Sequence, residues 1–207
     1  MSLLNEEEYA GIKGAYKSSN GAMTYNEVLK REIPVGWEVK KLDKICSVKY
    51  GKSFSNKDLL DEGYDVYGAN GIIGKYSTYT YSEPKILIGC RGSVGNISYT
   101  YGKVFITHNS LILDDLKIGF EYLYYYCKSM GFNHLISGSV QPQLTIDNAI
   151  QFDVLVPDKS IVDSFIERTH PLLLKKIALM EENRKLTELR DFLLPILMNG
   201  QVSLAQP

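Results

Sequence analysis

The sequence has few cysteines, no long apolar run and almost no net charge, and each absence narrows the class of protein. Cys46, Cys90 and Cys127 stand without a Cys-x-x-Cys pair, so neither a disulfide framework nor a zinc knuckle is expected, and a reducing cytosol fits best. No apolar run approaches the roughly 20 residues that span a bilayer, and a signal peptide is not recognisable. We therefore expect a soluble cytoplasmic protein without a membrane partner.

Charge is close to balanced, because 23 Lys and Arg residues stand against 24 Asp and Glu residues. A basic patch is the usual electrostatic sign of a nucleic-acid-binding protein, and only a small local excess of basic residues lies between residues 34 and 110. Charge alone therefore indicates no nucleic-acid partner, and such a function has to be inferred from other features.

Catalytic motifs are missing as well. Gly68–Lys75 superficially resembles a phosphate-binding loop, but Ala69 stands where the first glycine is needed and Tyr76 follows the lysine, so a turn is expected. Asp114 and Asp115 could suggest a metal-dependent nuclease, but turn chemistry after a strand explains them better. The histidines are isolated, and the Asn/Asp-Pro-Pro-Tyr/Phe motif of adenine methyltransferases is absent. We therefore expect no catalysis, metal or cofactor in this chain.

Composition divides the chain into four parts. Residues 1–33 are polar and are expected to form a linker or arm, with a short helix over residues 26–31. Residues 34–157 are rich in Gly and Tyr and alternate as strands do, so we expect one domain there. A helix over residues 158–200 and a tail of residues 201–207 follow.

Within the domain, short apolar runs bounded by turn residues predict strands. Residues 120–129 predict an amphipathic helix because apolar side chains recur at helical spacing, and shorter helices are expected over residues 56–62 and 144–149. The predicted strands are Val66–Tyr67, Lys85–Ile88, Val104–Ile106, Leu111–Leu113 and Phe152–Val156. Strands mixed irregularly with helices favour an α+β fold with a mixed, mainly antiparallel sheet.

The clearest element is the long helix after the domain. Apolar residues recur every seven positions in two neighbouring ladders, a pattern typical of a coiled-coil helix that packs on a second helix along its length. The ladders are Phe165, Leu172, Leu179, Leu186 and Leu193, and Ile166, Leu173, Met180, Thr187 and Leu194. At about 1.5 Å per residue, the helix is too long for the preceding domain to cover. We therefore expect a partner-helix interface on these ladders, formed by Phe165, Leu172, Leu173, Leu179, Met180, Leu186 and Leu193. The alternative is a terminal helix folded over its own core.

Two further features concern the prolines of the long helix and the tyrosines of the domain. Pro171 is expected to kink the helix and Pro195 to break its last turns. Tyrosine occurs 15 times, with a cluster between residues 76 and 101. Tyrosine favours binding surfaces, but alternating Tyr, Ser and Thr also fits a half-exposed sheet, and the sequence does not separate the two interpretations.

Four segments together resemble the specificity subunits of type I restriction-modification systems. They match, in order, the linker before a recognition domain, the start and the end of a target-recognition domain, and the end of the spacer helix. These segments are Tyr16–Gly21 with Lys30–Glu32, Ile33–Leu42, Gly138–Leu144 with Val156-Pro157, and Leu189–Pro195 with Met198–Gly200. The resemblance spans about residues 14–202, and it departs at Asp158-Lys159-Ser160, where the family often has Pro-Leu-x-Glu-Gln.

The resemblance implies a non-catalytic subunit that recognises one half of a bipartite site in double-stranded DNA. It also implies methylating and restriction subunits as partners, with S-adenosylmethionine bound by the methylating subunit, which flips the target adenine. The chain resembles either a half-subunit that forms a homodimer through its helix or a piece of a longer subunit with a second recognition domain.

For DNA recognition we expect loop side chains to enter the major groove and basic side chains to hold phosphates. The candidates are polar residues of predicted loops: Lys52, Asn70, Lys75, Tyr76, Arg91, Asn96, His108, Asn109, Ser139, Gln141 and Gln143. Two other classes remain open at this stage. One is a coiled-coil scaffold that binds protein instead of DNA, and the other is a self-contained nuclease or methyltransferase.

Overall fold

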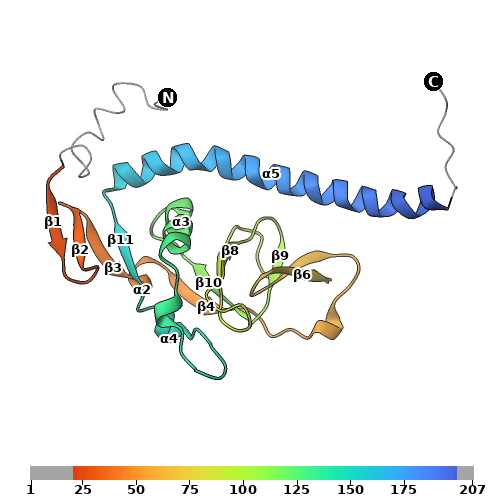
Figure 1. The fold of residues 1–207 in the computed structure, drawn as a ribbon, viewed down its shortest axis with the longest axis horizontal. Coiled ribbons are helices and arrows are strands. Elements are labelled where there is room, and N and C mark those ends of the chain that lie inside the picture. The colour runs from red at the N-terminus through yellow and green to blue at the C-terminus, as the bar shows by residue number, and fades with distance from the viewer. Residues whose placement is uncertain (1–20, 200–207) are drawn as a thin grey trace. The chain divides into compact units, whose positions relative to one another are not determined.

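The computed structural model describes residues 21–199, and it divides into two compact units at Ile166/Glu167. The first unit is an α+β domain, and the second continues the long C-terminal helix (Figure 1). Residues 1–20 of the expected arm, the last residue of the helix expected over residues 158–200 and the tail of residues 201–207 lie outside the described residues.

The strands are β1 (Met23–Asn26), β2 (Arg31–Pro34), β3 (Glu38–Lys41), β4 (Ser47–Tyr50), β5 (Tyr64–Gly68), β6 (Gly71–Tyr76), β7 (Ile86–Gly89), β8 (Ile97–Tyr99), β9 (Val104–Ile106), β10 (Ser110–Asp114) and β11 (Asp153–Val156). The helices are α2 (Leu42–Ile45), η2 (Asn56–Asp58), α3 (Phe120–Met130), η3 (Asn133–Leu135), α4 (Ile146–Ala149) and α5 (Lys159–Met198). The predicted strands are thus all present, with ends that differ by at most two residues.

Among the described residues the strands form four small sheets. The largest has the order β4-β10-β7-β8, and all of its pairs are antiparallel. A three-stranded sheet has the order β6-β5-β9, in which β5 and β9 are parallel. The antiparallel pairs β1–β2 and β3–β11 complete the set. The expected mixed, mainly antiparallel α+β fold is confirmed.

Two of the predicted short helices differ from the structure. The helix expected over residues 26–31 is wrong, because these residues connect β1 and β2 in a hairpin. Oδ1 of Asn26 accepts hydrogen bonds from the amides of Val28 (3.1 Å) and Leu29 (2.9 Å), and such side-chain turns compete with helix formation. The helix expected over residues 56–62 ends at Asp58.

The core lies where the two larger sheets meet. Tyr67, Leu87, Val104, Ile106 and Ile112 form a buried cluster drawn from strands of both sheets. Each fully buried aliphatic side chain stabilises the fold by roughly 1.5–3 kcal/mol relative to its exposed state. A second core region holds Phe132 stacked on Phe152, with ring centroids 4.2 Å apart.

Helix α3 packs on strands of two sheets through tyrosines. Tyr124 is buried and contacts the ring of Tyr99 on β8. The hydroxyl of Tyr122 donates to the carbonyl of Leu155 (2.7 Å), and that of Tyr126 donates to the carbonyl of Asp153 (3.1 Å). Burial is the largest cause that raises the pKa of Tyr122 and of Tyr126 above the ordinary value. These hydroxyls therefore fix α3 against β11.

The last strand of the domain, β11, pairs with β3, which follows the β1–β2 hairpin. In the antiparallel register of β3 and β11, Glu38 lies opposite Val156 and Lys41 opposite Asp153. Lys41 also forms an ion pair with Asp153 (2.8 Å). The segment between β3 and β11 therefore begins and ends at neighbouring positions.

The long helix expected over residues 158–200 is confirmed as α5. The carbonyl of Asp158 accepts hydrogen bonds from the amides of Ile161 (3.0 Å) and Val162 (3.2 Å) at its start. The helix continues through Pro171 and also through Pro195 to Met198, so the expected break at Pro195 is wrong. A proline in a helix removes one amide donor, and the surrounding hydrogen bonds maintain the helix here.

Candidate nucleic-acid interface

Five loop segments of the domain meet at one end of its sheets. We call them together the loop cluster, defined by residues 51–52, 69–70, 90–96, 107–109 and 137–143. Nine of the eleven predicted DNA-binding residues lie in it: Lys52, Asn70, Arg91, Asn96, His108, Asn109, Ser139, Gln141 and Gln143. Hydrogen bonds between segments far apart in sequence show that the cluster is a physical unit.

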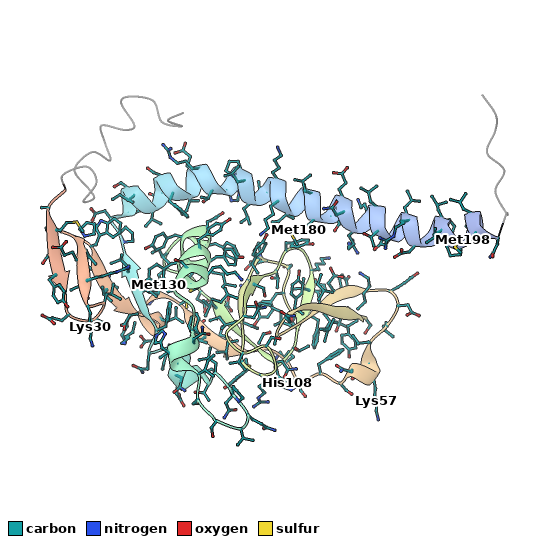
Figure 2. The ribbon with its side chains drawn as sticks, in the orientation of Figure 1. Lys30, Lys57, His108, Met130, Met180 and Met198 are labelled. Atoms are coloured by element: carbon teal, nitrogen blue, oxygen red, sulfur yellow. The ribbon has the colours of Figure 1, made fainter. Side chains whose placement is uncertain are left out.

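The segment around Lys52 is joined to the β9–β10 loop by backbone hydrogen bonds. The amide of Lys52 donates to the carbonyl of Ile106 (2.8 Å), and the amide of His108 donates to the carbonyl of Lys52 (2.8 Å). Gly51 permits this approach, because a Cβ at that position would lie 2.2 Å from the carbonyl oxygen of Thr107. The side chain of Lys52 is left exposed beside His108, which is labelled in Figure 2.

The loop between β7 and β8 contacts the other segments. The amide of Cys90 donates to the carbonyl of Asn109 (2.9 Å), and Nδ2 of Asn96 donates to the carbonyl of Ala69 (3.1 Å). The tight course of this loop requires positive φ angles at Gly92 (74°) and Gly95 (79°), a conformation that glycine adopts without strain. Arg91 is thereby placed at an exposed turn between the neighbouring loops.

The fifth segment is a small hairpin-like loop. The amide of Ser137 donates to the carbonyl of Gln143 (3.0 Å), and the reverse bond measures 2.8 Å. The amide of Leu144 donates to the carbonyl of Cys90 (3.1 Å), which anchors the loop beside Arg91. Ser139 and Gln141 are exposed at its tip.

The loop cluster has polar groups that the domain does not use for its own folding. Lys52 and Arg91 form no ion pair within residues 21–199, and both are exposed. Among the described residues, Nδ1 of His108, Oγ1 of Thr107 and Oγ of Ser110 are buried without a hydrogen-bond partner. A buried polar atom without a partner costs about 1–3 kcal/mol, and in native proteins such atoms call for an explanation such as a functional role.

Two predicted residues lie elsewhere. Lys75 and Tyr76 are on strand β6, so the expectation that they are loop residues is wrong. Nζ of Lys75 pairs with Asp65 (2.8 Å), and the ring of Tyr76 packs against Phe54 and Phe105. Both side chains are engaged within the domain, at the end of β6 remote from the turn at residues 69–70.

Asp114 belongs to a structural ion-pair network. Lys85 contacts it at 2.6 Å and Lys49 at 3.1 Å. Burial alone would raise the pKa of Asp114, but hydrogen bonds from the two lysines hold this pKa below its ordinary value. Asp115 adopts a positive φ of 51°, as a turn residue does. The predicted turn is therefore present, and a carboxylate already neutralised by two lysines is poorly suited to hold a metal.

No cluster of His, Cys, Asp and Glu able to hold a metal ion occurs in the described part of the chain. The same residues contain no helix that is long and apolar enough to cross a membrane. All three cysteines are buried and free. Burial raises the pKa of Cys46 to about 12, so this thiol is a core residue and not a nucleophile.

Sequence reasoning missed three exposed polar residues that the same loops bring to this end of the domain. They are Ser93, Asn133 and Ser137, and Oδ1 of Asn133 lies close to Gly95. The glycine spacing of the β7–β8 loop was the available signal for Ser93. Nothing local indicated the other two.

The chain matches the family described as the type I restriction modification DNA specificity domain over residues 34–185. This match covers more than half of the chain, and it includes the loop cluster and the first part of α5. The chain therefore belongs to this family.

Relatives and solved structures agree with the assignment. The chain is 27% identical over 201 residues to the type I restriction enzyme HindI specificity subunit of Haemophilus influenzae, covering 82% of this chain and 42% of that protein. It is 23% identical over 210 residues to the MjaIX specificity subunit of Methanocaldococcus jannaschii, covering 88% and 48%. The chain thus spans a little under half the length of these relatives.

The fold is similar to a crystallised type I restriction-modification S subunit from M. genitalium, with a TM-score of 0.59 and 19% identity over 74% of this chain and 44% of that one. A structure described as the basis of complex assembly and conformational transition of the type I R-M system gives a TM-score of 0.50, with 18% identity over 79% and 46%. These likenesses establish a shared fold.

Proposed function

We propose that this chain supplies the DNA sequence recognition of a type I restriction-modification specificity subunit, with the loop cluster contacting one half of a bipartite site. The observation that carries the proposal is the convergence of five polar loops at one end of a domain of this family. Lys52 and Arg91 supply charge for phosphates, and the amide and hydroxyl side chains supply donors and acceptors for base edges. The chain itself performs no catalysis and works in the cytoplasm.

The helix α5 supplies the second part of the function, which is assembly. Its seven-residue ladders are largely exposed: Leu172 is 66% exposed, Leu179 49% and Leu186 55%. Exposed apolar ladders of this length require a partner. We base the helix interface on the residues from Leu172 onward, because Phe165 contacts Tyr122 and Tyr125 of its own domain.

Among these later ladder residues, Met180 is 44% exposed and Leu193 37%, whereas Leu173 is buried. The helix packs on an equivalent helix, either of a second copy or of a second recognition domain, and fixes the separation of two DNA-recognising domains. Methylating and restriction subunits assemble on this subunit, and the methylating subunit binds S-adenosylmethionine.

The decisive experiment is to co-express the chain with its methylating subunit and to map methylated adenines in the host genome. A split motif that disappears when this chain is deleted is the expected result, and symmetric half-sites would indicate a homodimer. Purified chain should also bind DNA with an affinity that falls steeply as salt rises. Methylation that persists without this chain, or the absence of any salt-dependent DNA binding, would favour the scaffold alternative.

A further inference from the structure

A second candidate site lies in the domain, at the opposite end of β4 and β10 from the loop cluster. It is an open pocket of about 520 Å³, lined by the segment after β10, the end of β11 and the first turns of α5. In β10 the chain runs from Ser110, next to the loop cluster, to Asp114, after which Leu116–Gly119 line the pocket. At about 3.3 Å per residue, roughly 17 Å of strand separates the two sites.

At one side of the pocket, the start of α5 approaches the segment before α3 very closely. A Cβ on Gly119 would lie 2.1 Å from Cδ1 of Ile166. The inner surface is aliphatic and includes Ile45, Val156, Val162 and Ile166. An apolar side chain that entered this pocket would leave water for a hydrocarbon environment, which is favourable in proportion to the area covered.

Four lysines and a single aspartate, Asp163, line the pocket. Lys40 is paired with Glu38 (2.5 Å) and Lys44 with Asp43 (3.1 Å). The remaining two, Lys117 and Lys159, are exposed and form no ion pair within residues 21–199. An aliphatic pocket with an excess of positive charge at its opening is complementary to a ligand that is both apolar and acidic.

The lining favours a protein segment over a small molecule or DNA. Small-molecule sites place a few converging polar groups to fix orientation, whereas the charged side chains here are long and exposed. Phosphate contacts need basic side chains but no apolar pocket. A loop or helix end that carries a carboxylate next to a large apolar side chain uses both features.

We infer that the pocket docks an acidic segment of the methylating partner subunit, with a large aliphatic or aromatic side chain in the pocket and neighbouring carboxylates on Lys117 and Lys159. This inference rests on the proposed function, which provides the partner. It gives the domain two separate contacts, one with DNA and one with the subunit that modifies the DNA.

Carboxyl-to-amine cross-linking of the reconstituted complex tests the inference directly. Zero-length coupling with a carbodiimide joins a lysine amine to a carboxylate in contact with it, and mass spectrometry identifies the two peptides. The expected products join Lys117 or Lys159 to an Asp or Glu of the methylating subunit that is adjacent to a large apolar residue. Cross-links from other lysines of the same sample without any from these two, or links from these two only to this chain, would overturn the inference.

The double variant Lys117→Glu/Lys159→Glu provides the quantitative test. We expect its affinity for the methylating subunit to fall by about tenfold or more, because like charges opposed across an interface are strongly unfavourable. Lys117→Arg/Lys159→Arg should retain the affinity. The control Lys30→Glu/Lys57→Glu makes the same change in net charge at two other exposed positions of the domain (Figure 2) and should have no effect. Thermal unfolding establishes that each variant is folded.

DNA affinity measured on the same variants separates the possible failures. Unchanged DNA binding with weakened subunit binding supports the inference. Unchanged subunit binding, or a loss of DNA binding alone, overturns it and leaves the proposed function intact. If the unaltered chain binds neither DNA nor the methylating subunit, the proposed function fails as well.

Discussion

The same apolar residue types have opposite environments in the two units of this molecule. In the domain, Leu87, Leu111 and Leu123 are at most 1% exposed, whereas Leu172, Leu179 and Leu186 of the helix are 49–66% exposed. The domain buries the leucines of its strands and of α3 within its own core. Most of the helix ladder stays uncovered, and under the proposed function a partner covers it. Changes in the two units should therefore have separable effects.

The largest separable effect is expected for Leu179→Asp/Leu186→Asp. Burying each leucine in a helix interface contributes roughly 1.5–3 kcal/mol, and the new charges add a desolvation cost, so assembly should weaken by about a thousandfold or more. Analytical ultracentrifugation measures this change. The matched variant Lys185→Asp, which makes the same change in net charge at an exposed position on the face of the helix opposite the ladders, should leave assembly unchanged. An unchanged oligomer for the leucine variant would contradict the helix interface.

The converse change is Phe132→Ala in the domain. Phe132 is 0% exposed and stacks on Phe152, and replacing a buried phenylalanine by alanine costs about 3–5 kcal/mol. Chemical denaturation should show this loss while the helix retains its ability to assemble. Simultaneous loss of helix assembly under native conditions would show that the two units are coupled.

A smaller effect is expected for Asp114→Asn. This change leaves the largely buried Lys85 without its main partner and should lower the free energy of unfolding by about 2 kcal/mol. Because the pKa of Asp114 lies below the ordinary 3.8, its contribution to stability is present at neutral pH and is lost as the pH falls below about 4.

The free energy of unfolding of the variant should therefore fall less between pH 7 and pH 3 than that of the unaltered chain. Thermal unfolding across this pH range measures the difference. If the variant and the unaltered chain lose the same stability at acid pH, carboxylates other than Asp114 cause the loss.

The smallest effect distinguishes the loop cluster from the rest of the domain. Arg91→Ala should weaken DNA binding by about 1 kcal/mol and reduce the salt dependence by about one phosphate contact. Lys75→Ala, which removes a side chain paired with Asp65, should leave DNA affinity nearly unchanged. Fluorescence anisotropy at several salt concentrations measures both. Equal losses for the two variants would show that the loop cluster is not the interface.

The helix could be predicted from the sequence to within a residue or two, because its seven-residue ladder is a local pattern. The turn at Asn26 could not be predicted, because the composition of this segment also suits a short helix. The side-chain hydrogen bonds of Asn26 that favour the turn are not apparent from the sequence pattern. Strand pairing could not be predicted either. Nothing near Ser47 in the sequence indicates that β4 lies against β10, whose residues are more than sixty positions away.

The same reason limits prediction of the two sites. Most residues of the loop cluster could be chosen by composition, because turns rich in Gly, Asn and Ser are recognisable. Their convergence depends on long-range hydrogen bonds such as that from Leu144 to Cys90. The lysines of the pocket come from separate segments, and none of those segments is distinctive alone. Lys75 was misassigned because its partner Asp65 lies on the neighbouring strand.

The pairing of β3 with β11 has a further consequence for how such a protein can change. Because β3 and β11 are hydrogen-bonded neighbours, the segment between them has adjacent ends, and insertion or exchange at such positions is well tolerated. A different segment could be grafted between Glu38 and Val156 without altering the sequence of α5, so under the proposed function the choice of target and the spacing between targets could evolve independently.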